Sequence, residues 1–255
     1  MKLDDLFEGA ENDLNAAMTA QDMSYEFARW LTRNNEDTPL GELGMYHMTL
    51  PLKDNIEILA LPAERAEIPY DNLYLCVGWT PDGSEPKQFG FMAPALDEYG
   101  NTKFYAVVMV RDDPRKDVDV AYKIRWTTMT HELTHFLDYQ RGFKNGIKGN
   151  LGQRKKTGAE YYNDSLELNA HFQQGLAEMI QRLAHMQKKR EDMGAILGSF
   201  QSFLKWALPY MPKSYHLYLT PENKKKLQRR LYKLYVEIKD KWPNLDVVQQ
   251  YLATY

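Results

Sequence analysis

Residues 130–138 read Thr-His-Glu-Leu-Thr-His-Phe-Leu-Asp (THELTHFLD), and the interpretation of the whole chain depends on this stretch. His131 and His135 are four residues apart, so a helix places both imidazoles on one face, one turn apart. Two imidazoles so placed can bind one metal ion, and zinc takes imidazole nitrogen at about 2.0–2.1 Å. Glu132 can take a proton from a water molecule whose pKa the metal lowers towards about 7. The alternative is a pair of surface histidines on an ordinary amphipathic helix.

The residues around this motif predict an amphipathic helix over about 117–141. Its apolar residues form one stripe, and the two histidines point away from it. The stripe consists of Tyr122, Trp126, Met129, Leu133 and Phe136. Asp138 follows His135 by three residues on the histidine face and could orient a ligand imidazole by accepting its second ring N–H. An exposed aspartate near a helix end is the other interpretation of Asp138.

A catalytic zinc needs three protein ligands and a water, so a third ligand must come from elsewhere. The metzincin pattern requires Gly and His three and six residues after the second histidine. Asp138 and Arg141 occupy these positions and exclude that class. Glu167, in the first turn of a helix predicted over 164–190, is the preferred third ligand, and His171, one turn later, is the alternative. Asp164 and Glu167 also have capping-box spacing, in which Glu167 would bond the N–H of the cap residue instead.

The order of predicted elements defines the fold class. A helix over 4–33 precedes strand-like segments at 56–61, 72–79, 87–93 and 103–110, and turn residues separate these segments. Beyond residue 113 the patterns are helical, at 117–141, 164–190, 195–209, 221–241 and 244–255. We therefore predict an α+β fold in one domain, residues 1–255. It comprises a helical segment (1–40), a small, mainly antiparallel sheet (45–112), the metal-site helices (113–190) and a helical C-terminal part (191–255).

Composition and charge exclude several classes of protein. The formal net charge of −3 argues against a nucleic-acid partner, because binders of polyanions usually carry a basic excess. The single cysteine, Cys76, excludes an intrachain disulfide and fits a reducing compartment. The acidic N-terminus has no apolar core like that of a secretion signal, and no run is long enough to span a bilayer. We expect a cytoplasmic protein with no membrane partner; its oligomeric state stays open.

The motif His-Glu-Leu-Thr-His, followed by a glutamate on a later helix, resembles the gluzincin branch of the zinc metallopeptidases. The segments HELTHFLDYQR and YYNDSLELNAHFQ also resemble uncharacterised peptidase-like proteins of bacteriophages and bacteria. The resemblance covers about residues 100–185 and implies a zincin-like fold, with His131, His135 and Glu167 binding Zn²⁺ and Glu132 as the catalytic base. A phage origin would place the protein in the host cytoplasm or the virion. The chain departs from thermolysin-like enzymes at Glu-x-x-x-His (167–171), where they carry Glu-x-x-x-Asp.

The predicted function is hydrolysis of peptide bonds in a protein or peptide substrate. The segment 103–110 is either an edge strand to which an extended substrate could add or a buried central strand. Tyr161 and Tyr162 are the first candidates for stabilising the transition state, and His216 is the second. One alternative is a zinc amidohydrolase acting on a small acylated substrate; peptide deformylases use a cysteine ligand, for which this chain offers Cys76 alone. The other is a non-catalytic assembly or virion protein whose zinc is structural or lost.

Overall fold

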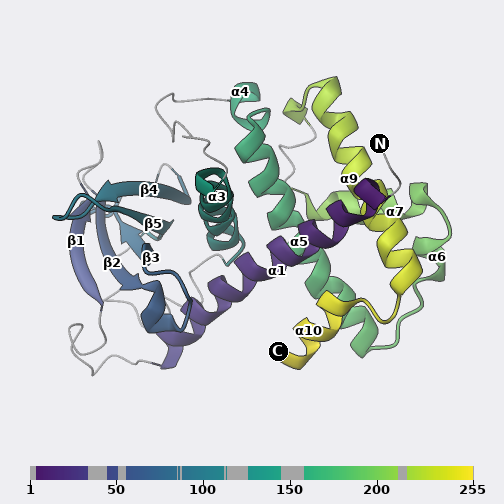
Figure 1. Cartoon of the computed structure of the whole chain (residues 1–255), viewed down its shortest axis with the longest axis horizontal. Coiled ribbons are helices and arrows are strands. Elements are labelled where there is room, and N and C mark those ends of the chain that lie inside the picture. The colour runs from purple at the N-terminus through teal and green to yellow at the C-terminus, as the bar shows by residue number, and fades with distance from the viewer. Residues whose placement is uncertain are drawn as a thin grey trace. The chain divides into compact units, whose positions relative to one another are not determined.

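The structure is a computed structural model that describes residues 4–33, 45–50, 56–84, 86, 88–111, 113, 126–144, 158–211 and 217–254. It has a five-stranded mixed sheet in the N-terminal half and helices in the C-terminal half (Figure 1). The chain divides into two compact units: a sheet unit, Ala20–Leu151, and a helical unit, Met1–Thr19 with Gly152–Tyr255. The α+β prediction is confirmed, and the single-domain organisation stays a prediction.

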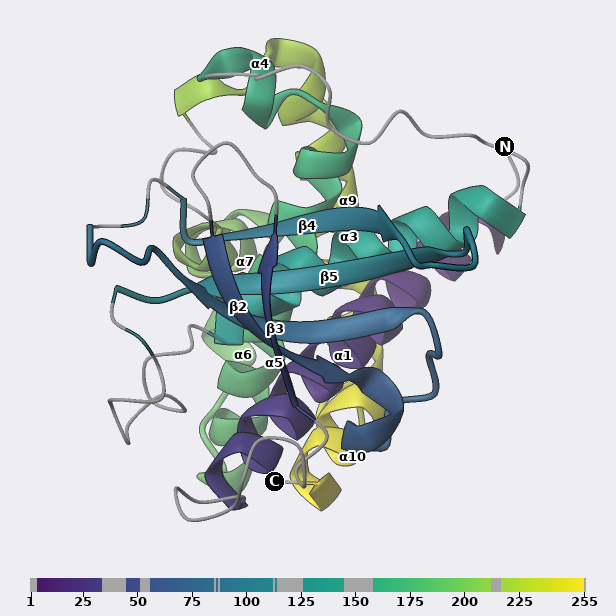
Figure 2. The same cartoon turned by 90° about the vertical axis from the view of Figure 1, so that its left-hand side faces the viewer.

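The sheet has the strand order β1-β2-β3-β5-β4 (Figure 2). Its strands are β1 (Tyr46–Leu50), β2 (Ile56–Pro62), β3 (Leu73–Trp79), β4 (Gly90–Leu96) and β5 (Thr102–Met109). β3 and β5 are parallel, and the other neighbouring pairs are antiparallel. The segment 103–110 therefore forms a central strand, and β4 is the edge strand beside it. The sequence patterns did not predict β1, and they placed the start of β4 three residues too early.

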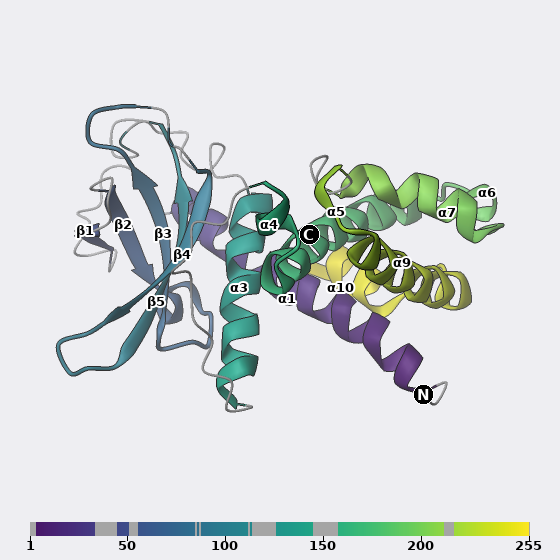
Figure 3. The ribbon, with the colours of Figure 1, turned by 90° about the horizontal axis from the view of Figure 1, so that it is seen from above.

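One helix follows the sheet and carries the histidine motif. This helix, α3 (Trp126–Lys144), packs on β5 and β4 (Figure 3). Met129, Leu133 and Phe136 are completely buried in the core of the sheet unit. The ring of Phe136 meets the ring of Tyr70 edge-on at 4.9 Å. The predicted stripe is confirmed at these three positions, while Tyr122 lies outside the described residues.

The first helix, α1 (Asp4–Arg33), matches its predicted range and contributes to the cores of both units. A short 3₁₀ turn, η1 (Ala63–Ala66), follows β2 in the sheet unit. The helical unit contains α4 (Ala159–Tyr162), α5 (Ser165–Lys188), α6 (Gly194–Leu197), α7 (Phe200–Ala207), the 3₁₀ turn η3 (Leu208–Tyr210), α9 (Pro221–Lys241) and α10 (Asp246–Thr254).

Capping residues explain where the helices of the helical unit begin. The predicted helix 195–209 is divided into α6 and α7 because the hydroxyl of Ser199 accepts the N–H of Ser202 and starts a new helix. As predicted, α9 begins at Pro221, and the Thr220 hydroxyl accepts the N–H of Asn223. The partly buried Arg230 guanidinium donates to both carboxylate oxygens of Asp13 and so joins α9 to α1.

The packing of α3 predicts unequal costs for two leucine truncations. Leu133 is completely buried, whereas Leu166 at the start of α5 is 43% exposed. We expect Leu133→Ala to lower the free energy of unfolding by about 2–5 kcal/mol, because it leaves a cavity under α3. Leu166→Ala should change it by less than about 0.5 kcal/mol. Urea unfolding followed by circular dichroism measures both, and equal losses would contradict the packing described for α3.

Candidate metal centre

The packing of α3 on the sheet sets the direction of its polar side chains. A helix turns by about 100° per residue, so His131 and His135 lie about 200° and 240° around the axis from Met129. Glu132 lies about 300° around, which places it on one flank of the buried stripe. The histidines therefore face away from the sheet, as the sequence predicts.

The two imidazoles converge on one point. The Nε2 atoms of His131 and His135 lie 3.2 Å apart, and their ring planes are nearly perpendicular, at 86°. Two nitrogens bound to the same tetrahedral zinc at about 2.0–2.1 Å are about 3.3–3.4 Å apart. His131 is buried and His135 is half-buried. The spacing and directions of the two nitrogens fit a pair of ligands to one metal ion.

The carboxylate of Glu132 lies against the edge strand. Glu132 is buried, and its Oε1 is 2.9 Å from the position that a Cβ atom on Gly90 would occupy. Thr128, one turn before Glu132 on the same flank, places its methyl group 2.6 Å from the same point. The absence of a side chain at Gly90 thus lets α3 approach β4 closely at the proposed catalytic base. A glycine inside a strand pattern is a sequence signal for such an approach, but the partner of Gly90 could not be read from the sequence.

The preferred third ligand, Glu167, belongs to the helical unit. It is half-buried in the first turn of α5, where the helix dipole favours a negative charge. The side chain of Asp164 caps this helix by accepting the N–H of Leu166. The N–H of Asp164, which Glu167 would bond in a capping box, donates to the carbonyl of Tyr161.

The structure brings Tyr161 and Tyr162 to His171. Tyr162 lies between two rings: its centroid is 5.3 Å from that of His171 and 5.5 Å from that of Tyr218. Tyr161 meets the His171 ring edge-on at 5.7 Å. Tyr162 is therefore well explained as a packing residue that orients His171, and its role in the transition state stays a prediction. Asp138 is half-buried on α3, and His216 lies outside the described residues.

Asn163 holds the outer ring of this stack in place. Its side-chain amide donates to the carbonyls of Ala159 and Tyr218 and accepts the N–H of Thr220. These bonds join the turn between α4 and α5 to the segment just before α9. The sequence analysis did not single out Asn163 or Tyr218, because contacts between residues so far apart leave no local pattern.

Cys76 is not placed to be a metal ligand beside the histidines. It is completely buried in β3 on the sheet face that also buries Ile58 and Val107. The stripe of α3 packs on the opposite face, with Leu75 and Val77. Burial raises the pKa of the Cys76 thiol well above its usual value, which disfavours the thiolate that binds metal. The cysteine-ligand arrangement of the amidohydrolase alternative therefore does not fit this chain.

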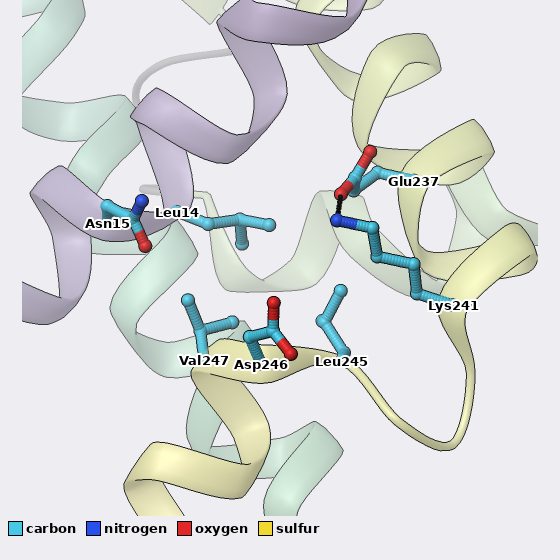
Figure 4. A pocket seen from close by; sticks show the side chains of 7 residues that line it. All are labelled: Leu14, Asn15, Glu237, Lys241, Leu245, Asp246 and Val247. Carbon is cyan, nitrogen blue, oxygen red and sulfur yellow. Dashed lines mark ion pairs between the residues drawn. The ribbon is translucent and has the colours of Figure 1, made fainter.

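The helical unit contains a pocket that is too small to bind a substrate. Figure 4 shows it between α1, α9 and the start of α10, with the ion pair of Glu237 and Lys241 on one side. Its volume of about 20 Å³ has room for about one water molecule.

The chain was compared with protein families, curated proteins and solved structures. No protein-family model matches the chain, and neither does any curated protein or solved structure. Within the described ranges, no helix is long and apolar enough to cross a membrane.

The burial of Cys76 predicts an unreactive thiol. At neutral pH the folded protein should react with a chromogenic disulfide reagent at least about a hundredfold more slowly than the urea-unfolded chain, because reaction requires an accessible thiolate. The absorbance of the released thiolate follows the reaction in both states. Rapid stoichiometric labelling of the folded protein would contradict the burial of Cys76.

Proposed function

We propose that this protein is a zinc-dependent metallopeptidase of the gluzincin type, which hydrolyses peptide bonds of a protein substrate. The observation that carries the proposal is the 3.2 Å approach of the two Nε2 atoms of His131 and His135 on a helix that also buries Glu132. Two converging imidazoles next to a buried carboxylate supply the groups that metal-assisted hydrolysis needs.

In this proposal Glu167 is the third protein ligand. His131 and His135 are carried by α3 of the sheet unit, and Glu167 is an acidic residue in the first turn of α5 of the helical unit. Two imidazole nitrogens and one carboxylate oxygen are a donor set of catalytic zinc sites, which leave the fourth position to water. His171, one turn after Glu167, is then a group beside the centre, and the rings of Tyr161 and Tyr162 restrict its orientation.

Each side chain has a defined task in the proposed reaction. A zinc ion held by these residues would lower the pKa of its water towards about 7 and would polarise the scissile carbonyl. Glu132 accepts the proton from the attacking water and delivers it to the leaving amine. Tyr161 and Tyr162 remain candidates to donate a hydrogen bond to the carbonyl oxygen as it gains negative charge.

The edge strand supports a peptide as the substrate. β4 pairs with β5 on one side, and its first residue, Gly90, adjoins Glu132. The backbone of an edge strand can bind an extended peptide as an additional strand. A peptide bound along β4 would pass the carboxylate of Glu132, whereas a small acylated substrate would make no use of this edge.

The metal content of purified variants tests the proposed ligands. We expect about one zinc per chain in the wild type and much less in His131→Ala, His135→Ala and Glu167→Ala, because each change removes one of three protein ligands. Glu160→Ala, which changes an exposed glutamate on α4, is the matched control and should retain zinc. Elemental analysis of protein purified without added metal gives the ratio.

Other patterns of zinc content would change the assignment. Zinc retained in Glu167→Ala but lost in His171→Ala would make His171 the third ligand. A well-folded wild type that binds no zinc, even when zinc is supplied, would overturn the proposed function.

Glu132→Gln separates catalysis from metal binding. We expect peptide hydrolysis to fall by about 10²–10⁴-fold while zinc content is unchanged, because the amide cannot accept the proton from water. Cleavage of a fluorogenic peptide library, normalised to zinc content, measures the loss, with Glu160→Gln as control. Full activity in the zinc-loaded Glu132→Gln variant would show that Glu132 is not the base.

A further inference from the structure

We propose that Gly90 is a positioning residue: the missing side chain at this position of β4 sets where the Glu132 carboxylate lies. This inference rests on the proposed function, in which Glu132 is the general base. It adds a residue 42 positions away in the sequence (132 − 90) that acts on the reaction only through Glu132. The contacts around Gly90 carry the inference.

Three atoms surround the place where a Cβ atom on Gly90 would lie. They are the Thr128 methyl carbon at 2.6 Å, Glu132 Oε1 at 2.9 Å and the Val107 carbonyl oxygen at 3.0 Å. All three distances are shorter than ordinary van der Waals contacts, so an added methyl group must displace something. The Val107 oxygen is part of the backbone of the central strand β5. Thr128 has a short, branched side chain with few alternative rotamers on a helix.

The carboxylate of Glu132 is the group that can move most easily. It lies at the end of a flexible side chain, whereas Thr128 and Val107 are held close to the backbone. The backbone of β4 cannot withdraw freely, because Gly90 is paired with Val108 and the carbonyl of Phe89 accepts the N–H of Met109 at 2.9 Å. A methyl group at position 90 would therefore push the carboxylate away from β4 without changing its chemistry.

The chain offers a matched control in Gly78. A Cβ atom there would be equally crowded, 2.8 Å from the Met109 sulfur and 2.9 Å from a Val107 methyl carbon. Gly78 also lies inside a strand, but its crowding neighbours are apolar side chains buried on the other face of the sheet. The same substitution at the two glycines thus tests two different neighbours, a proposed catalytic carboxylate and an apolar core.

The kinetic experiment compares Gly90→Ala with Gly78→Ala. We expect zinc-loaded Gly90→Ala to lose about 10²-fold in kcat, with KM within about twofold, because a misplaced base costs about that much. Gly78→Ala should lose stability but keep the kcat of the wild type per folded molecule. Adding Thr128→Ser to Gly90→Ala removes the methyl contact, so stability should recover while kcat stays low. Wild-type kcat in folded, zinc-loaded Gly90→Ala would overturn the proposal.

A second readout does not depend on activity. In protein with ¹³C-labelled glutamate side chains, Glu132→Gln identifies the Glu132 carboxyl resonance. At one fixed pH, this resonance should shift in Gly90→Ala and stay in place in Gly78→Ala. If the wild type hydrolyses no peptide, the proposed function fails, and this resonance still decides the role of Gly90. An unchanged Glu132 resonance in folded Gly90→Ala would overturn the positioning role.

Discussion

The burial of one apolar stripe of α3 against the sheet is the contact on which the candidate centre depends. Met129, Leu133 and Phe136 are completely buried there, and each such side chain contributes about 1.5–3 kcal/mol by leaving water. Rotating the helix by one residue, about 100°, would expose these side chains and direct the histidines elsewhere. Apolar packing therefore fixes the direction of the two imidazoles without the help of a metal ion, as preorganisation of the proposed site requires.

The sequence predicts most of the secondary structure because burial leaves a periodic pattern. β2, β3 and β5 lie inside the sheet and are buried on both faces, so they appear as nearly continuous apolar runs. β1 is an edge strand whose residues are mostly exposed, and its short sequence, YHMTL, carries no such run. The parallel pairing of β3 with β5 is equally hidden, because Leu73 faces Phe104 across the ladder and local sequence does not name a partner.

The candidate site divides in the same way into local and long-range features. The approach of His131 to His135 follows from helix geometry alone, so four-residue spacing was enough to predict it. The contact of Glu132 with Gly90 depends on how α3 lies on the sheet, and nothing in either segment encodes it. Likewise, the ring of Tyr218 next to Tyr162 depends on hydrogen bonds to Asn163, which lies 55 residues before Tyr218 in the sequence.

Several polar residues of α3 occupy buried positions. Thr130, His131, Glu132 and Thr134 are all buried, although a helix segment enclosed on every side is usually apolar. The two threonines form their hydrogen bonds within the helix, because their hydroxyls donate to the carbonyls of Trp126 and Thr130.

His131 and Glu132 are buried ionisable residues on the same helix. A buried ionisable group, even when it is paired, rarely stabilises a fold more than an apolar residue of the same size. The chain thus keeps an imidazole and a carboxylate where apolar side chains would serve the fold at least as well, and departures of this kind are concentrated at functional sites. The burial of these two ionisable side chains therefore supports the metal centre proposed for α3.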